Sequence, residues 1–519
     1  MTHETAKTKL WPVCIAAALA VLVPGPTRAE TGVLDGVDEY VNSALDEWDV
    51  PGASLAIVKD GQVVLVRGYG VTRVGESRSV DAHTVFPLAS ITKNFTATAV
   101  ALLVEEGRLN WDDTVVKHLL GFEFSDEYRT RHTTIRDLLC HRTGLERGDP
   151  LPRRGDVSID DVVQRVRFLQ PVHGFRERWE YNNLMYYVAG AVVARCADTT
   201  WEEFVADRLL GPLEMDETFT SRVGVPAETS AFVHRLVDGK VVAADWTDRH
   251  LGVSPAGSMY SNAEDMAKWL LAALGGEGGS ETLLKQSTRR EMQSIQMSVP
   301  VTWDRTDNPY AARFYGWGLG WTVLDYRGRK LCYHAGSTGT MFAVVPEENL
   351  GVAVLTAMDW SNLPGMLMYD VIDAFLDGPK QAWDRTNWEF WRMADPHPDL
   401  ERQKNLREAE AKRVSDTKPS VPLNTFAGRY ECDLYGDLVV THADGQLMFT
   451  FGRNGPSPLE HWDHDSFYIR SPILDVPTDD WLIDFEVKNG AAASLAIERI
   501  GWHEAMPRFH RVDESTDEK

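Results

Sequence analysis

Ser90 and Lys93 stand in a spacing that can make a serine hydroxyl nucleophilic. The serine follows the apolar run TVFPLA and opens residues 90–106 (SITKNFTATAVALLVEE), which have the spacing of an apolar helix. A serine at a helix N-terminus lies near the positive end of the helix dipole, and a lysine three residues later lies on the same face. Its amine can accept the hydroxyl proton if burial and positive neighbours lower the lysine pKa.

The pair by itself has another interpretation. Ser-x-x-Lys occurs by chance in many chains, as a helix N-cap followed by a solvated lysine. Here the apolar residues Phe95, Ala99, Leu102 and Leu103 continue the helix, which favours burial and therefore the chemical interpretation.

Other catalytic and cofactor motifs are missing from the sequence. There is no GxSxG elbow, no HExxH, no P-loop and no GxGxxG in a suitable context, so we expect neither a metal nor a cofactor. The cluster at 461–465 (HWDHD) could suggest a metal site, but it lies between predicted strands, where a polar turn is the better interpretation. His141, in the run LLCHRTGL, is interpreted as structural.

Several further motifs follow Ser90 in order. Tyr181-Asn182-Asn183 has the form Tyr-x-Asn, and His334-Ala335-Gly336 has the form His-x-Gly. With VPGASLAIVKDGQVV, the nucleophile segment, TIRDLLCHRTGL and SPAGSMYSNAEDMAKW, they make the chain resemble the serine β-lactamase and penicillin-binding protein superfamily. The resemblance is greatest to its class C-like branch, which includes D-alanyl-D-alanine carboxypeptidases, D-aminopeptidases and class C-type esterases, and it covers most of residues 35–377.

The resemblance implies a role for each motif residue. Ser90 would be acylated, Lys93 would help to deprotonate it, and Tyr181 would carry a proton to the leaving group. Asn183 would hydrogen-bond the substrate amide, and the backbone N–H groups of Ser90 and Ser337 would form an oxyanion hole.

His334 and Gly336 would line the site as the third motif. Relatives with Lys-Thr-Gly at this place have a permanent positive charge for a β-lactam carboxylate, and a histidine lacks that charge at neutral pH. Tyr181 as a core tyrosine and His334 as a satisfied strand histidine stay open as alternatives.

The helices and strands that must position these residues are predicted within residues 34–377, with the strands near the two ends of this segment. Residues 34–48, 184–195, 258–274 and 365–377 have helical spacing. Strands are predicted at 54–68, where Asp60-Gly61 marks a hairpin, and again over 315–357. We therefore expect an α+β fold, with a β-lactamase/transpeptidase-like antiparallel sheet flanked by helices and interrupted by a helical insertion.

The 519 residues divide further. We predict a signal peptide at 1–29, a hydrolase domain at 30–377, a linker with a charged helical run at 378–423, an antiparallel β domain at 424–511 and an acidic tail at 512–519. Asp444-Gly445 and Asn489-Gly490 mark hairpins in the β domain, which resembles the lipocalin-like domain of some of these hydrolases. In those relatives it packs near the active site.

The net charge, the N-terminal residues and the cysteines indicate which partners, location and thiol state to expect. The formal net charge is -24, which disfavours nucleic acid as a partner. Lys7 and Lys9 before an apolar run, with Thr27-Arg28-Ala29 after it, predict export with cleavage near Ala29 and no stable membrane span. Lipidation at Cys14 is disfavoured by Val13, and the other cysteines are expected to be isolated buried thiols.

The sequence thus predicts an exported serine hydrolase that cleaves small peptides, amides or esters, in the manner of a D-amino-acid peptidase or an esterase. A true β-lactamase and a non-catalytic penicillin-recognising protein are the alternatives. The sequence leaves the oligomeric state and the natural substrate open.

Overall fold

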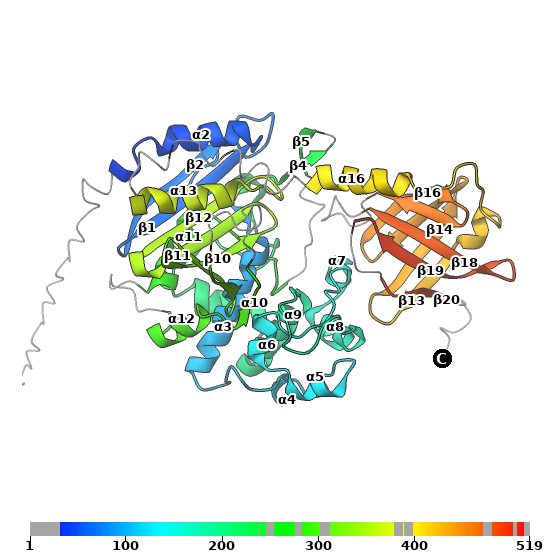
Figure 1. Ribbon diagram of the computed structural model, residues 1–519, viewed down its shortest axis with the longest axis horizontal. Coiled ribbons are helices and arrows are strands. Elements are labelled where there is room, and N and C mark those ends of the chain that lie inside the picture. The colour runs from blue at the N-terminus through cyan, green and yellow to red at the C-terminus, as the bar shows by residue number, and fades with distance from the viewer. Residues whose placement is uncertain are drawn as a thin grey trace, which may run out of the picture.

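The computed structural model describes residues 32–237, 239–244, 254–275, 283–301, 312–377, 383, 388, 398–470, 480–501 and 506–512. In Figure 1 a large mixed unit is joined through one helix to a β-barrel formed by the last part of the chain. The predicted signal peptide, much of the predicted linker and nearly all of the predicted tail lie outside the described residues.

The large unit is built on an eight-stranded sheet in which neighbouring strands are antiparallel. Its first hairpin pairs directly with a strand from the end of the segment, in the register Ala56 with Ala353. This confirms the prediction that one sheet uses both ends of the segment. The strand order is β2 (Gln62–Gly70), β1 (Gly52–Lys59), β12 (Leu350–Thr356), β11 (Thr340–Val345), β10 (Arg329–Gly336), β9 (Thr322–Tyr326), β8 (Tyr315–Trp317) and β7 (Met297–Ser298).

Both faces of the sheet are covered, because successive strand side chains point to opposite sides. Leu55 and Ile57 pack with α2 (Val37–Glu47) and α13 (Leu363–Asp377). Ala56 and Val58 belong to the second core, which contains α3 (Thr92–Glu105), α9 (Leu184–Ala197) and α11 (Ala263–Leu274). Figure 1 shows α13 lying along the sheet, beside α2.

The helical insertion surrounds α9, which is buried along most of its length. An evenly apolar helix of this kind is typically buried on all sides, and α9 packs against α3 and four short helices. These are α4 (Val115–His118), α6 (Ile135–Leu139), α8 (Ile159–Arg165) and α10 (Trp201–Val205), and the insertion also contains α5 (Glu127–His132) and α7 (Pro150–Arg153).

Two local predictions were wrong. The helix expected over 258–274 begins only at Ala263, because Asn262 caps it by accepting a hydrogen bond from the backbone N–H of Asp265. The insertion, expected to be helical, also contains a hairpin, β4 (His234–Val237) and β5 (Lys240–Ala243). Short strands of this kind carry too little periodicity to be recognised in a sequence.

The C-terminal strands close into an antiparallel barrel, in which the last strand pairs with the first. Alternate residues fill its interior, which includes Phe449, Trp481 and Phe485. The strands are β13 (Gly428–Cys432), β14 (Gly436–Ala443), β15 (Gln446–Phe451), β16 (Asn454–Asp463), β17 (Ser466–Ile469), β18 (Trp481–Lys488), β19 (Ala491–Arg499) and β20 (Phe509–Val512). The lipocalin-like architecture expected from the sequence is therefore present.

The charged run of the predicted linker forms α16 (Pro398–Glu410). Arg402 on this helix makes a buried ion pair with Asp480 at the start of the β18 region, 2.9 Å from nitrogen to oxygen. The helix is therefore fastened to the barrel.

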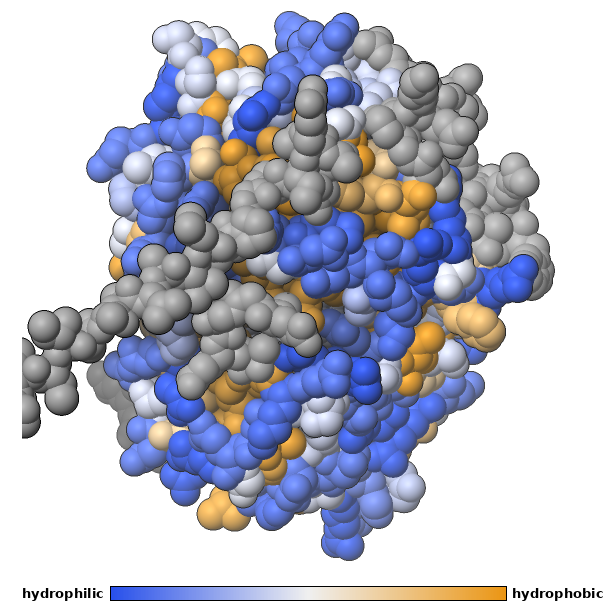
Figure 2. All heavy atoms as spheres, turned by 90° about the vertical axis from the view of Figure 1, so that its left-hand side faces the viewer, coloured by the Kyte–Doolittle hydropathy of each residue, from blue (hydrophilic) through white to orange (hydrophobic). Residues whose placement is uncertain are grey.

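The surface and the cysteines complete the description. The face seen in Figure 2 is mainly hydrophilic, with smaller apolar groups between. Cys140 and Cys332 are buried and Cys196 and Cys432 are partly exposed, all four as free thiols. Two of them therefore depart from the expected buried state. Among the described helices none has the length and apolar character needed to cross a membrane.

Candidate active site

Ser90 lies on a strained turn between a short strand and the nucleophile helix. The strand is β3 (Phe86–Pro87), and a turn of 3-10 helix at Ala89–Ile91 precedes α3. Ala89 has a φ of 45°, a left-handed conformation that costs energy for a residue with a Cβ. Strain of this kind is held where surrounding contacts fix the backbone, and here the backbone N–H of Leu88 donates to the carbonyl of Met259 over 2.8 Å.

Two predicted catalytic side chains converge on the hydroxyl of Ser90. The Nζ atom of Lys93 lies 3.0 Å from the Oγ atom of Ser90. The phenol of Tyr181 donates a hydrogen bond to the same Oγ atom over 2.9 Å. Lys93 also donates to the carbonyl of Ala256 over 2.7 Å, which fixes its amine beside the serine. The residues predicted to act as nucleophile, base and proton carrier are thus in direct contact.

Burial sets the protonation of both partners. The Lys93 side chain is fully buried, and the loss of hydration lowers its pKa well below the ordinary lysine value. The charge of Asp149 opposes this effect, while those of Arg147 and Arg153 add to it. Burial raises the pKa of Tyr181 to about 12. Both shifts favour the uncharged forms, a neutral amine and a protonated phenol.

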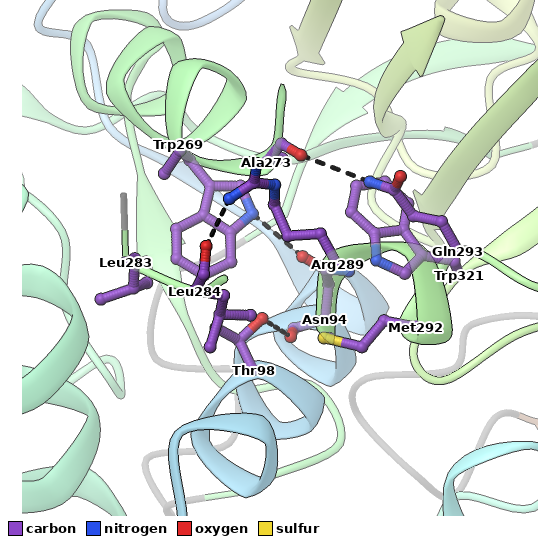
Figure 3. A pocket seen from close by; sticks show the side chains of 11 residues that line it. Asn94, Thr98, Trp269, Ala273, Leu283, Leu284, Arg289, Met292, Gln293 and Trp321 are labelled. Atoms are coloured by element: carbon purple, nitrogen blue, oxygen red, sulfur yellow. Dashed lines mark hydrogen bonds between the residues drawn. The ribbon is translucent and has the colours of Figure 1, made fainter. Parts of the chain in front are cut away.

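A mainly apolar pocket lies beside α3, and Ser90 does not line it (Figure 3). Asn94, the residue after Lys93, donates to the carbonyl of Gly320 over 3.0 Å and accepts from the Trp269 indole over 3.0 Å. Phe95 stacks on Trp269 with ring centroids 3.8 Å apart. Both polar groups of the Asn94 side chain are thus used in hydrogen bonds inside the fold. These bonds help to fix the helix that carries Lys93.

Strand β10 ends against the nucleophile turn. A Cβ atom on Gly336 would lie 2.3 Å from the carbonyl oxygen of Leu88, so only glycine allows this approach. The hydroxyl of Thr340 donates to that same carbonyl over 3.2 Å, and the hydroxyl of Thr338 donates to the Pro87 carbonyl over 2.7 Å. Ser337 stands between these contacts, and its carbonyl accepts from the backbone of Trp360 over 2.9 Å.

His334 is buried as a neutral imidazole. Its Nδ1 atom lies 2.9 Å from the carbonyl oxygen of Ala335, so this nitrogen carries the hydrogen and donates it. Burial and the nearby Lys93 lower the His334 pKa to about 3. Its Nε2 atom is then an acceptor, and it has no hydrogen-bond partner among the described residues.

Asn183 is held by a residue that sequence reasoning missed. Its amide donates to the Oδ1 atom of Asp149 over 2.7 Å, and the Asp149 carboxylate is itself paired with Arg147 at 2.8 Å. The Arg147 guanidinium lies 5.1 Å from the ring centre of Tyr181. No sequence pattern indicated these two residues, because Arg147 and Asp149 lie in a loop with no motif.

His141 packs inside the same cluster. Its ring centre is 4.4 Å from that of Tyr181, and its Nδ1 atom accepts from the backbone N–H of Asn182 over 3.1 Å. Burial lowers the His141 pKa well below its ordinary value. Trp317, also missed, lies between the two histidines, with ring centroids 4.9 Å from His141 and 5.4 Å from His334. The walls of the site are therefore aromatic and uncharged on this side.

The C-terminal barrel contacts the segment that follows Asp149 through hydrogen bonds and an ion pair. Arg154, just after α7, donates to the carbonyl of Tyr435 over 2.8 Å and pairs with Asp437 at 3.1 Å. Asn454 donates to the carbonyl of Arg153 over 2.9 Å. The barrel therefore holds α7, which begins one residue after Asp149.

Comparisons with known proteins show the family of the chain. The family described as Beta-lactamase matches residues 37–370, which is more than half of the chain. The chain belongs to this family. A domain family of unknown function, DUF3471, matches residues 412–514. The chain is accordingly a serine hydrolase of the β-lactamase-related type.

Relatives span most of the length. The chain is 30% identical over 456 residues to "Unguisins hydrolase ungD'" of Aspergillus campestris, covering 81% of this chain and 80% of that protein. It is 25% identical over 338 residues to "Protein flp" of Staphylococcus aureus, covering 64% of each.

Solved structures share the fold. The octameric penicillin-binding protein homologue from Pyrococcus abyssi has a TM-score of 0.58 at 22% identity, covering 92% of this chain and 99% of that one. EstCE1, a hydrolase with promiscuous acyltransferase activity, has a TM-score of 0.56 at 19% identity, covering 67% of this chain and 100% of that one.

Proposed function

We propose that this chain hydrolyses small amides, peptides or esters through an acyl-enzyme on Ser90. The observation that carries the proposal is the convergence of Lys93 and Tyr181 on the Ser90 hydroxyl, at 3.0 and 2.9 Å. Membership of the β-lactamase family supports it, since the Ser-x-x-Lys, Tyr-x-Asn and His-x-Gly positions lie within the matched residues.

Acylation begins when Ser90 attacks the substrate carbonyl and its proton passes to the neutral amine of Lys93. The bond from Oγ to carbon forms, and the carbonyl oxygen becomes an oxyanion, which the backbone N–H groups of Ser90 and Ser337 stabilise. Tyr181 donates its phenolic proton to the leaving nitrogen or oxygen and regains one from the Lys93 ammonium. The carbonyl–leaving-group bond then breaks.

Deacylation repeats these steps with water. A water molecule attacks the acyl carbon and its proton passes through Tyr181 to Lys93, so that the amine is protonated again. Collapse of the second tetrahedral intermediate breaks the bond from carbon to Oγ, and Lys93 returns the proton to Ser90. The cycle leaves the enzyme unchanged, with no added cofactor required.

His334 favours substrates that carry no carboxylate group near this side chain. Its ring is buried and uncharged, so it brings no positive charge to an anionic group of the substrate. A β-lactam carries a carboxylate, and a neutral imidazole supplies no charge to bind it. We therefore rank amide or ester hydrolysis above β-lactam hydrolysis.

Labelling tests the acyl-enzyme. The wild-type chain and Ser90→Ala are treated with a fluorophosphonate and with a fluorescent β-lactam. We expect fluorophosphonate labelling that is lost in Ser90→Ala. If neither probe labels Ser90, the non-catalytic alternative replaces this proposal.

Substrate panels decide between the two enzymatic readings. Turnover of nitrocefin is measured beside p-nitrophenyl esters and D-amino-acid amides. We expect ester or amide turnover to dominate, and turnover of nitrocefin alone would identify a β-lactamase instead.

We also propose that the chain is exported with cleavage near Ala29. The support is the sequence alone: Lys7 and Lys9, the apolar run from Leu10 to Val23, and small residues at 27 and 29. The N-terminal residue of the mature protein, read by mass spectrometry from an expressing cell, tests this. A retained Met1 would contradict it.

A further inference from the structure

A second reactive cluster lies away from Ser90, at the far end of α9. Cys196 lies in the last turn of this helix, and its Sγ atom is 3.4 Å from the Nδ1 atom of His118, the last residue of α4. The Nε2 atom of the same imidazole is 3.0 Å from a carboxylate oxygen of Asp113. Thiol, imidazole and carboxylate thus form one hydrogen-bonded chain, the arrangement that activates a nucleophile.

Asp113 fixes the proton positions in this chain. Its carboxylate accepts from the backbone N–H of Asn110 over 3.0 Å and pairs with Lys117 at 2.7 Å. These contacts with Lys117, Asn110 and His118 lower the Asp113 pKa to about 2 despite partial burial, so the group is an anion. An anionic carboxylate can only accept, so His118 holds its hydrogen on Nε2 and presents the lone pair of Nδ1 to the thiol.

Space for a small molecule lies beside His118, the residue that contacts the thiol. A hollow of ≈ 360 Å³ is lined by His118, by apolar residues that include Leu119 and Val163, and by the charged residues Asp160, Arg167 and Arg195. His118 is the hydrogen-bond partner of Cys196, and Arg195 precedes it in the chain. The charged groups that act on the thiol are Arg108, Asp113, Arg195 and Lys117, of which three are cations.

We propose that Cys196 is a modification site that forms a mixed disulfide with small disulfides, with His118 as the base. The Sγ atom attacks one sulfur of the disulfide while its proton passes to Nδ1 of His118. The bond between Sγ and that sulfur forms, the original S–S bond breaks, and the leaving thiolate takes the proton from His118. One disulfide and one protein thiol become one mixed disulfide and one small thiol, without any other oxidant.

The cationic surroundings indicate which disulfides react best. Arg167 and Arg195 line the hollow beside His118 against one carboxylate, Asp160, and Arg108 and Lys117 act on the thiol itself, so the cations favour a reagent with carboxylates. Burial raises the pKa of the Cys196 thiol, so the thiol is protonated at rest and its attack depends on His118. Above the thiol pKa, hydroxide removes the proton and the histidine is no longer required.

The experiment measures the rate of mixed-disulfide formation at each cysteine of the folded full chain. The probes are the dianionic dithiobis(nitrobenzoate) and the neutral dithiodipyridine, with peptide mapping by mass spectrometry. Cys432 is the internal control, because it is also partly exposed and its Sγ atom accepts from the backbone N–H of Tyr435 over 3.3 Å rather than from an imidazole. We expect Cys196 to react about 10-fold faster than Cys432 near neutral pH, and faster with the dianionic probe.

Variants test the role of the imidazole. His118→Gln should slow Cys196 by about 10-fold or more near neutral pH, with the difference closing in strong alkali. His83→Gln, at an exposed histidine paired with Glu217, should change nothing. Fluorophosphonate labelling at Ser90 reports that each variant is folded. Equal rates at Cys196 and Cys432 in the wild type, or an unchanged rate in folded His118→Gln, would overturn the proposal, and the wild-type comparison decides alone if the variant does not fold.

Discussion

The amide of Asn183 donates a hydrogen bond to the buried carboxylate of Asp149, over 2.7 Å. Asp149 is 1% exposed, and Arg147 balances its charge from 2.8 Å away. The pair joins the loop before α7 to the motif that contains Tyr181. The orientation of Asn183 is therefore set by a residue outside the three motifs, and Asp149 also acts electrostatically on Lys93.

Asp149→Asn should lower kcat/KM by about 10-fold and shift its acid limb to lower pH. The charge of Asp149 raises the pKa of Lys93, so its removal lowers that pKa further and the neutral amine persists into more acidic solution. A pH profile of ester hydrolysis measures both effects. Asp160→Asn, at an exposed position on α8, is the control, and an acid limb that moves upward would contradict the assignment.

Lys93→Met should abolish labelling of Ser90 and remove a pH dependence of stability. The unfolded chain binds a proton at Lys93 up to a pKa of about 10.4 that the folded chain does not hold, so the wild-type free energy of unfolding rises with pH across this window. The stability of Lys93→Met relative to wild type should therefore fall as the pH rises.

Denaturant unfolding at several pH values measures this difference. Lys117→Met, at an exposed lysine, is the control. A difference between Lys93→Met and wild type that is constant with pH would mean that Lys93 is charged in the fold.

Gly336→Ala should lower kcat by about 100-fold, because displacements of about 1 Å at a reacting group have that effect. The new Cβ atom would lie 2.3 Å from the carbonyl oxygen of Leu88, two residues before Ser90, so β10 or the nucleophile turn must move. Gly257→Ala is a matched control, since its Cβ atom would be 3.7 Å from the backbone of Ala89, an ordinary contact. Steady-state kinetics on one ester would show the contrast, and equal rates for the two variants would refute it.

Arg154→Ala should destabilise the chain by about 2–3 kcal/mol, since it leaves buried carbonyl groups without a charged donor. The Arg154 side chain is 7% exposed and bridges α7 to the barrel through Tyr435 and Asp437. We also expect a lower kcat/KM, because the barrel then holds the Asp149 loop less firmly.

Thermal unfolding and ester kinetics measure both effects. Arg131→Ala, in an ion pair whose side chains are 69% and 75% exposed, should cost less than about 1 kcal/mol. A loss of stability in Arg154→Ala with unchanged kinetics would show that the barrel does not support the site.

Local sequence determined much of this protein. The apolar helix after Ser90 places Lys93 one turn on, because that spacing is fixed by helix geometry alone. Asp444-Gly445 and Asn489-Gly490 turn the barrel hairpins because both residues of each pair have positive φ values. Asp60-Gly61 likewise indicated the hairpin that contains β1, and the order of elements predicted one sheet from both ends of the segment, which the pairing of β1 with β12 confirms.

Only the tertiary structure decided the electrostatics and the supports of the site. The neutral state of Lys93 depends on burial by distant segments, and the tautomer of His334 depends on how its ring meets the Ala335 carbonyl. Asp149 reaches Asn183, and Arg154 reaches Tyr435, across 34 and 281 residues. Contacts between residues so far apart in the chain leave no periodicity or spacing in the sequence, because folding alone brings them together.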